Sequence, residues 1–122
     1  MMKIGKRVPY CVPVEKIRFI CEQDGVPERG LKKEISKLLV RDKRVSRAYL
    51  VRIAIEGSDE YLVALCLSID SGKKLPLVRK VSKIFSKMFS ENQHIEIMFL
   101  DEKAETKVVG VCSPFYVRMN KR

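Results

Sequence analysis

The sequence contains no tryptophan and only one histidine, His94. Its four cysteines are far apart, and no two of them form a C-x-x-C pair; they are Cys11, Cys21, Cys66 and Cys112. Compact zinc sites need paired ligands, so this spacing argues against a metal and predicts no cofactor. Two disulfides are possible by number, but Cys66 lies among apolar residues. Buried free thiols are therefore the favoured interpretation.

Long apolar runs are also missing. No run approaches the ~18 residues of a membrane span. The first ten residues are basic and lack the apolar stretch of a secretory signal. We therefore expect a cytoplasmic protein that does not associate with a membrane.

Features of an enzyme active site are scarce. The six glycines are dispersed, so no phosphate-binding loop is predicted. A nucleophile needs a base and an orienting group within reach. Cys66 and His94 fall on the same predicted sheet face, but the flanking Leu65 and Leu67 favour inert packing of the cysteine. We expect no catalytic residue and a protein that is not an enzyme.

Acidic residues are outnumbered by basic ones. The 122 residues include 25 Lys and Arg against 15 Asp and Glu, which gives a net charge of +10. Such a balance favours anionic partners, whether nucleic acid, acidic proteins or lipid headgroups, and it also keeps a protein soluble. The length fits one domain, which can bury roughly two-thirds of its unfolded surface.

Two strands and a tight connection, residues 48–69, organise the chain. Gly57 can take the positive φ that a short hairpin needs. Residues alternate with a period of two, which places one set on each side of the ribbon. The bulky set should face a core: Tyr49, Val51, Ile53, Ile55, Tyr61, Val63, Leu65, Leu67 and Ile69. The smaller, mixed set should be half-buried or exposed: Ala48, Leu50, Arg52, Ala54, Leu62, Ala64, Cys66 and Ser68.

Two helices are predicted by apolar residues at helical spacing, each with a proline, Pro27 or Pro76, in its first turn. The first runs to about Arg41. The second should dock on the bulky side of the hairpin. Their apolar stripes are Leu31, Ile35, Leu38 and Leu39, and Leu77, Val78, Val81, Ile84, Phe85, Met88 and Phe89.

Shorter elements complete the chain. Residues 16–21 and 94–100 alternate like strands, with Ile95, Ile97 and Phe99 toward the core. Residues 101–107 are expected to form a loop or one helical turn, and 108–111 a short strand. Pro9 and Pro13 make a central strand improbable at the start, so 1–15 is an arm or edge strand.

The element order is strand, helix, strand, strand, helix, strand. It predicts an α+β domain at 16–118, with a four-stranded, mainly antiparallel sheet and both helices on one face. The split βαβ, or ferredoxin-like, order is the simplest closure. An N-terminal arm precedes this domain, a C-terminal segment closes it, and 119–122 form a basic tail.

Several segments, read in order, resemble a known family. They are ICEQDGVPERGLKKEISKLLVRDKRVSRAYLVRI, YLVALCLSID, IEIMFLD and the closing Ser113-Pro114-Phe115-Tyr116. This series is similar to the C-terminal domain of the SseB, or "enhanced serine sensitivity", proteins of bacteria, over about residues 17–118. The resemblance implies an α+β domain in a bacterial cytoplasmic setting, and it implies no catalytic or binding residues.

Basic residues on the two predicted helices form one candidate site. If both helices cover one side of the sheet, their charges merge into a patch that either is merely solvated or binds an anionic partner. Like charges at i,i+4 destabilise a helix by only about 0.2–0.5 kcal/mol per pair, so a folded protein can carry such a patch even if the patch has no function. The candidate anion-binding residues are Lys32, Lys33, Lys37, Arg41, Lys73, Lys74, Arg79, Lys80, Lys83 and Lys87.

The mixed sheet face and the closing aromatic pair form the other candidate. The face offers no aromatic residue and is a poor platform for RNA bases. It suits a protein or homodimer contact, or a cover made by the N-terminal arm, and Arg52 and Glu96 could pair across it. Phe115 and Tyr116 either dock a partner or close the core edge as a C-terminal clasp. The candidate contact residues are Leu50, Arg52, Leu62, Glu96, Met98, Phe115 and Tyr116.

The sequence thus favours a non-enzymatic protein-interaction module of the SseB C-terminal type, which binds another protein or a second copy of itself. The alternative is a module that binds nucleic acid or another polyanion through the basic helices.

Overall fold

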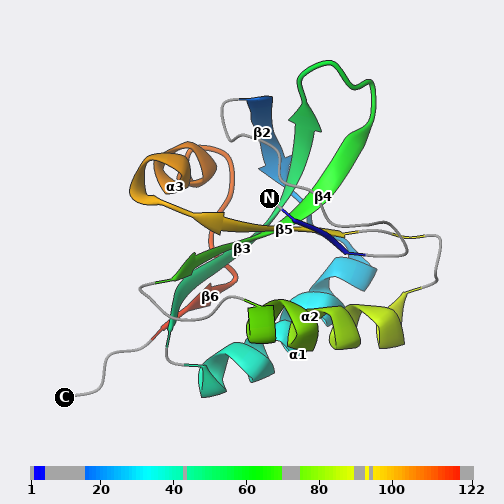
Figure 1. Cartoon of the computed structure of the whole chain (residues 1–122), viewed down its shortest axis with the longest axis vertical. Helices are drawn as coiled ribbons and strands as arrows, with labels where there is room; N and C mark the ends of the chain where they lie inside the picture. Colours follow the sequence, from blue (N-terminus) through cyan, green and yellow to red (C-terminus); the bar gives the residue numbers. More distant parts are fainter. Residues whose placement is uncertain are drawn as a thin grey trace.

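The computed structural model describes residues 2–4, 16–42, 44–69, 75–89, 93 and 95–118. Figure 1 shows the order and arrangement of the helices and strands. The elements are β1 (Met2–Ile4), β2 (Ile17–Glu22), α1 (Val26–Arg41), β3 (Val45–Ile55), β4 (Tyr61–Ile69), α2 (Leu75–Met88), β5 (Ile95–Leu100), α3 (Glu102–Val109) and β6 (Tyr116–Val117). Of the predicted N-terminal arm, residues 2–4 form β1 at a sheet edge, and 1 and 5–15 lie outside the described residues.

The sheet is mixed. Its strand order is β1-β5-β4-β3-β2, and β6 also pairs with β3. β4 and β5 run parallel, whereas the other pairs are antiparallel. The predicted α+β class is confirmed, but the predicted four-stranded, mainly antiparallel sheet in split βαβ order is wrong, because the sheet has six strands and is mixed. A split βαβ unit has another strand between the two that its helix connects. Here α1 connects the neighbours β2 and β3, and α2 connects the neighbours β4 and β5.

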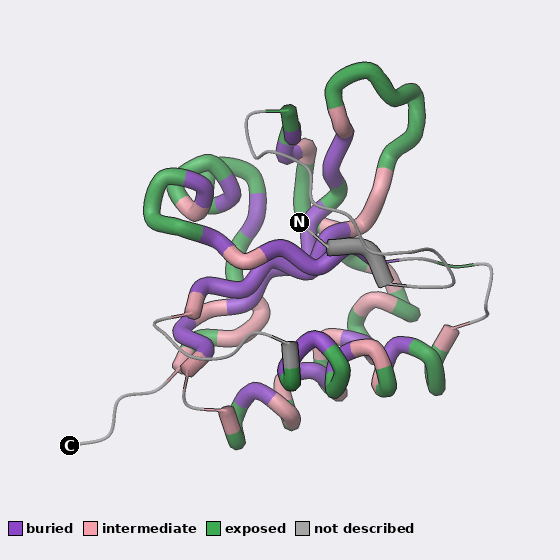
Figure 2. The backbone as a smooth tube through the Cα atoms, viewed as in Figure 1, coloured by how far each residue is buried: buried purple, intermediate pink, exposed green. Residues whose placement is uncertain are grey.

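Both predicted helices lie on one face of the sheet, as expected (Figure 1). The apolar sides of α1 and α2 and this sheet face form the first core, which includes Ile35, Leu39, Val81, Leu65 and Ile97. Burial is concentrated along the strands and on the inward turns of the helices (Figure 2). Each large apolar side chain removed from water contributes about 1.5–3 kcal/mol. The outer sides of both helices remain polar and exposed.

The other face of the sheet is also buried, which the sequence did not predict. A second core joins this face to α3 and includes Tyr49, Val51, Cys66, Met98 and Val108. The sheet therefore lies between two helical layers.

This second core explains an error in the predicted hairpin faces. Leu50 lies opposite Leu65, and Tyr49 lies opposite Cys66. The bulky residues of β4 therefore share the α1–α2 face with the smaller set of β3, while Tyr49, Val51 and Ile53 face α3. Because both faces are buried, side-chain bulk did not distinguish them. The turn itself was predicted correctly, since Gly57 has φ +86°.

The segment after β5 was also predicted incorrectly. Residues 102–109 form the two-turn helix α3, in place of the predicted loop or single helical turn followed by a short strand. Its start is fixed by Asp101, whose Oδ1 accepts a hydrogen bond from the Ala104 N–H at 2.7 Å. Ala104 and Val108, four residues apart, are both buried against the sheet. The helix thus has a cap and an apolar stripe, although most of its residues are polar.

Candidate functional site

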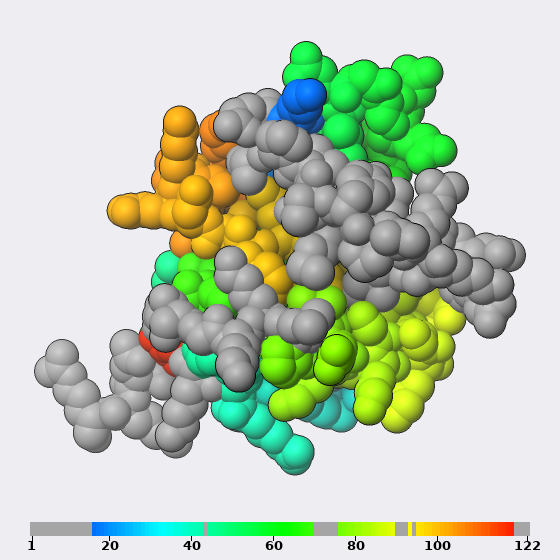
Figure 3. All heavy atoms as spheres, viewed as in Figure 1, coloured from blue at the N-terminus to red at the C-terminus, as the bar shows by residue number. Residues whose placement is uncertain are grey.

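The outer sides of α1 and α2 carry a concentration of positive charge, which we call the basic helical surface. In α2, all four charged residues are basic, and in Figure 3 the atoms of this helix lie at the molecular surface beside those of α1. Among the described residues of this surface, only Lys37 forms an ion pair, with Glu34 at 3.0 Å. Its members, all exposed, are Lys33, Lys37, Arg41, Arg79, Lys80, Lys83 and Lys87.

Three of the ten candidate anion-binding residues are not placed on this surface. Lys73 and Lys74 lie outside the described residues. The side chain of Lys32 is only 13% exposed, and its Nζ lies 3.4 Å from Glu22 Oε2 and 3.2 Å from Asp24 Oδ1. Lys32 is therefore neutralised by two carboxylates and adds little to the surface charge.

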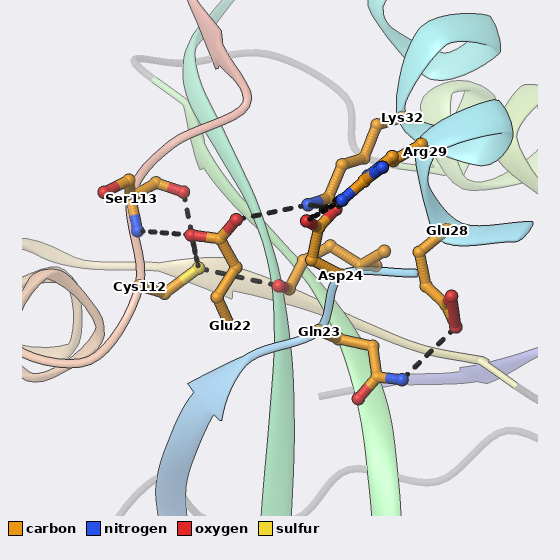
Figure 4. A network of polar contacts seen from close by, with 9 residues as sticks. Glu22, Gln23, Asp24, Glu28, Arg29, Lys32, Cys112 and Ser113 are labelled. Carbon is orange, nitrogen blue, oxygen red and sulfur yellow. Dashed lines mark hydrogen bonds and ion pairs between the residues drawn. The ribbon is translucent and has the colours of Figure 1, made fainter. Parts of the chain in front are cut away.

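The network around Lys32 links β2, α1 and the segment after α3 (Figure 4). Arg29 Nη2 lies 3.2 Å from Asp24 Oδ2, and the Ser113 N–H donates to Glu22 Oε1 at 3.2 Å. Hydrogen bonds from Arg29 and Lys32 hold the pKa of Asp24 below its usual range. Glu22, Asp24, Arg29 and Lys32 each have an opposite charge beside them, so this network joins three segments of the fold.

The two buried thiols that the structure describes show no sign of activation. Cys66 and Cys112 are buried and free, and Cys21 is exposed and free. Burial raises the pKa of both buried thiols, that of Cys112 to about 11. A raised pKa suppresses the nucleophilic thiolate. The other member of the predicted Cys66–His94 pair, His94, lies outside the described residues.

A second polar cluster fastens α3 to the sheet. Arg47 Nη2 lies 2.9 Å from Glu105 Oε1, and the Tyr49 hydroxyl donates to Glu105 Oε2 at 2.6 Å. The hydrogen bond from Arg47 is the main cause that lowers the pKa of Glu105 to about 2, while burial raises the pKa of Tyr49 to about 12. The sequence did not predict this cluster, because its residues come from segments far apart along the chain.

The structure contradicts the predicted open contact face. Leu50, Glu96 and Met98 are each 1% exposed. Arg52 is exposed, but its Nε donates to Gln23 Oε1 at 3.2 Å. It also lies on the opposite side of the sheet from Glu96, so the predicted Arg52–Glu96 pair is wrong. The physical reason is that helices cover both faces of the sheet: Met98 packs in the second core with α3, whereas Leu50 packs in the first core with α1 and α2. Leu62 is half-buried against the second core.

The aromatic pair near the C-terminus closes the edge of the first core. Phe115 and Tyr116 are half-buried against it. The Phe115 N–H donates to the Ala48 carbonyl at 2.9 Å, and the Tyr116 hydroxyl donates to the Leu39 carbonyl at 3.2 Å. This arrangement is the clasp, so little of either ring is presented to a partner.

A hollow lined mainly by charged residues lies next to the basic helical surface. Leu38, Arg41, Asp42, Arg44 and Lys80 line this hollow, where the end of α1 meets α2. Asp42 and Arg44 were not predicted as site residues, and the only sequence signal was their place in a charged connection. No cluster of three or more potential metal ligands occurs in the parts of the chain that the structure describes. In the same parts, no helix has the length and apolar character needed to cross a membrane.

Comparison with known proteins identifies the family. The model of the SseB protein C-terminal domain matches residues 20–118. No curated protein and no solved structure matches the chain. The matched range covers every described element from the end of β2 to β6. The chain therefore belongs to the SseB C-terminal domain family.

Proposed function

We propose that the chain is a non-enzymatic interaction module that binds an acidic partner protein through the basic helical surface. The observation that carries the proposal is the charge of α2: Arg79, Lys80, Lys83 and Lys87 are exposed, and within the described residues none of them forms an ion pair.

The burial of the sheet supports this choice of surface. Helices cover both of its faces, so the residues first considered for a protein contact are largely internal. Base stacking on an open sheet, a common mode of RNA recognition, has no counterpart in the described residues. An exposed field of one sign accelerates association with a partner of the opposite sign and selects against like-charged partners.

The test is a pair of matched charge reversals in the full chain. Lys83 and Lys87 on α2 are four residues apart and exposed, as are Lys103 and Lys107 on α3. The double variants Lys83→Glu/Lys87→Glu and Lys103→Glu/Lys107→Glu change the net charge equally but on opposite sides of the sheet. Affinity for a labelled glutamate-rich peptide is measured by fluorescence anisotropy between about 50 and 200 mM salt.

We expect the α2 variant to lose about tenfold in affinity at the lowest salt, equivalent to ~1.4 kcal/mol, and the α3 variant to keep its affinity. Equal losses in the two variants would show a general charge effect and would contradict the proposal. If single-stranded RNA binds more tightly than the peptide, and the α2 variant loses this RNA binding, the partner is a nucleic acid and the proposal of an acidic protein is wrong.

A further inference from the structure

The hollow at the end of α1 has the size of a ligand site and a mainly charged lining. It is formed by the last turns of α1, the connection to β3 and the first half of α2. Its volume of about 590 Å³ falls within the ~300–1,000 Å³ of small-molecule pockets. Leu38 supplies an apolar wall, and the other lining residues are Arg41, Asp42, Arg44 and Lys80.

One ion pair joins two of the residues that line this hollow. Arg44 Nε donates to Asp42 Oδ1 at 2.9 Å, and its Nη2 donates to Oδ2 at 2.6 Å. The Arg44 backbone N–H also donates to Asp42 Oδ1 at 3.1 Å. The Asp42 side chain is only 9% exposed, so this carboxylate is largely shielded from solvent. The guanidinium of Arg44 is thereby held at the hollow and does not need to be ordered by a ligand.

The remaining cations have no such neutralising partner. Arg41 and Lys80 are exposed and form no ion pair with any described residue. Lys80 is close enough to act on the Asp42 carboxyl, whose pKa lies below its usual range chiefly because of the Arg44 hydrogen bond and also because of the Lys80 charge. The described lining residues thus comprise three cations and one ionised carboxylate, which sum to two net positive charges.

We propose that this hollow binds a phosphomonoester dianion. A phosphomonoester carries about −1.5 to −2 charges at pH 7, which matches the two net positive charges. A carboxylate or a phosphodiester carries only one. Arginine side chains also present a planar fork that binds two phosphate oxygens at once. The inference rests on the proposed function, because it names the anionic group of the partner that the basic helical surface binds.

Calorimetric titration of the full chain tests the site. The probes are inorganic phosphate, dimethyl phosphate, and one acidic peptide prepared with phosphoserine, serine or glutamate at the same position. The variant Arg41→Gln/Lys80→Gln removes two charges from the hollow, and Lys83→Gln/Lys87→Gln removes two from α2 outside the lining. Thermal melts establish that each variant is folded.

We expect inorganic phosphate to bind at least about tenfold more tightly than dimethyl phosphate, a difference of ~1.4 kcal/mol. The hollow variant should lose at least about tenfold in affinity for phosphate, and the α2 variant less than about threefold. A phosphoserine peptide that binds more tightly than both its glutamate form and free phosphate identifies a phosphorylated protein as the source. Equal affinity of the phosphopeptide and free phosphate identifies a small phosphate compound.

Two results would overturn the inference: equal binding of the monoanionic and dianionic probes, or equal losses in the two variants. Its failure is distinguishable from that of the proposed function. If the glutamate-rich peptide depends on Lys83 and Lys87 while phosphate shows no preference for the hollow, only the phosphate site is wrong. If phosphate depends on Arg41 and Lys80 while no acidic peptide binds, only the acidic-protein function is wrong.

Discussion

Arg47 on β3 and Glu105 on α3 form a two-pronged ion pair across 58 residues of sequence. Arg47 Nε lies 2.5 Å from Glu105 Oε2, and Nη2 lies 2.9 Å from Oε1. Tyr49 donates a further hydrogen bond to the same carboxylate. This geometry fixes α3 on the sheet face that would otherwise be open, so the ion pair helps to decide which surfaces a partner can reach.

Glu105→Gln should destabilise the fold. The glutamine keeps the shape of the side chain but loses the negative charge that faces Arg47. Its amide N–H₂ would also point at a group that is itself a hydrogen-bond donor, on either Arg47 or Tyr49. Removing one partner of a partly buried charged hydrogen bond costs about 1–3 kcal/mol, and the lower part of this range is expected because Arg47 is 42% exposed. Urea unfolding measures the change.

The control is Glu60→Gln, which removes the same charge from an exposed residue before β4. It should change the free energy of unfolding by no more than ~0.5 kcal/mol. Equal effects of the two variants would show that Glu105 contributes only its share of the net charge.

The lowered pKa of Glu105 should make the free energy of unfolding depend on pH. The hydrogen bond from Arg47 lowers the pKa of Glu105 in the folded chain to about 2, from an ordinary value of 4.5. The unfolded chain therefore takes up this proton first as the pH falls. Stability from Glu105 is complete above about pH 5 and is lost progressively toward pH 2. Over this range Arg47 and Tyr49 keep their protons, because even the ordinary pKa of each side chain lies far above pH 5.

The measurement is urea unfolding of the parent chain and of Glu105→Gln at several pH values. The difference in unfolding free energy should be constant from pH 7 to about 5 and should narrow below that. A difference that stays constant to about pH 3 would mean that the carboxylate has an ordinary pKa in the folded chain.

The role of α3 as a cover can be tested with two adjacent valines. Val108 is fully buried in the second core, whereas Val109 is 58% exposed. Val108→Ala should lower the free energy of unfolding by about 1–3 kcal/mol, because it removes buried methyl groups and leaves a cavity. Val109→Ala, with the same change in composition and helix propensity, should stay within ~0.5 kcal/mol. Similar values for both would place α3 away from the sheet in solution.

The local patterns of the sequence predicted most elements but not the second helical layer. The stripe from Leu77 to Phe89 and the turn at Gly57 were sufficient for α2 and the hairpin. By contrast, α3 has only Ala104 and Val108 as buried residues in eight positions, so its apolar stripe is short. Because α3 was not predicted, the side of β3 that carries Tyr49 was predicted to face α1 and α2, whereas it faces α3. The predicted strand order was wrong for a related reason. Amphipathic periodicity indicates which side chains share a face of the sheet, but it does not indicate which strands lie next to each other.

The candidate site shows a similar division. Exposure of the α2 lysines follows from helical periodicity and was predicted. Burial of Lys32 depends on Glu22 and Asp24, which reach it only after β2 and α1 have packed. The hollow at Arg41 requires Lys80 from a different helix, so no short window of sequence contains it.

The cysteines provide the last prediction. Iodoacetamide should modify Cys21 rapidly in the folded chain, because this residue is exposed. Cys66 and Cys112 should react at least about a hundredfold more slowly, since each is buried and its raised pKa suppresses the thiolate. Mass spectrometry of peptides distinguishes the sites, and all three should react at similar rates in concentrated urea.

Cys112 makes this experiment informative about local opening. Its Sγ lies 3.5 Å from the Leu50 carbonyl and 4.0 Å from Glu22 Oε1, beside the network that holds Ser113 (Figure 4). Modification of Cys112 as fast as Cys21, with Cys66 still protected, would contradict the described packing of residues 110–115. In that case the segment after α3 opens without unfolding of the sheet, and the clasp of Phe115 and Tyr116 is not closed in solution.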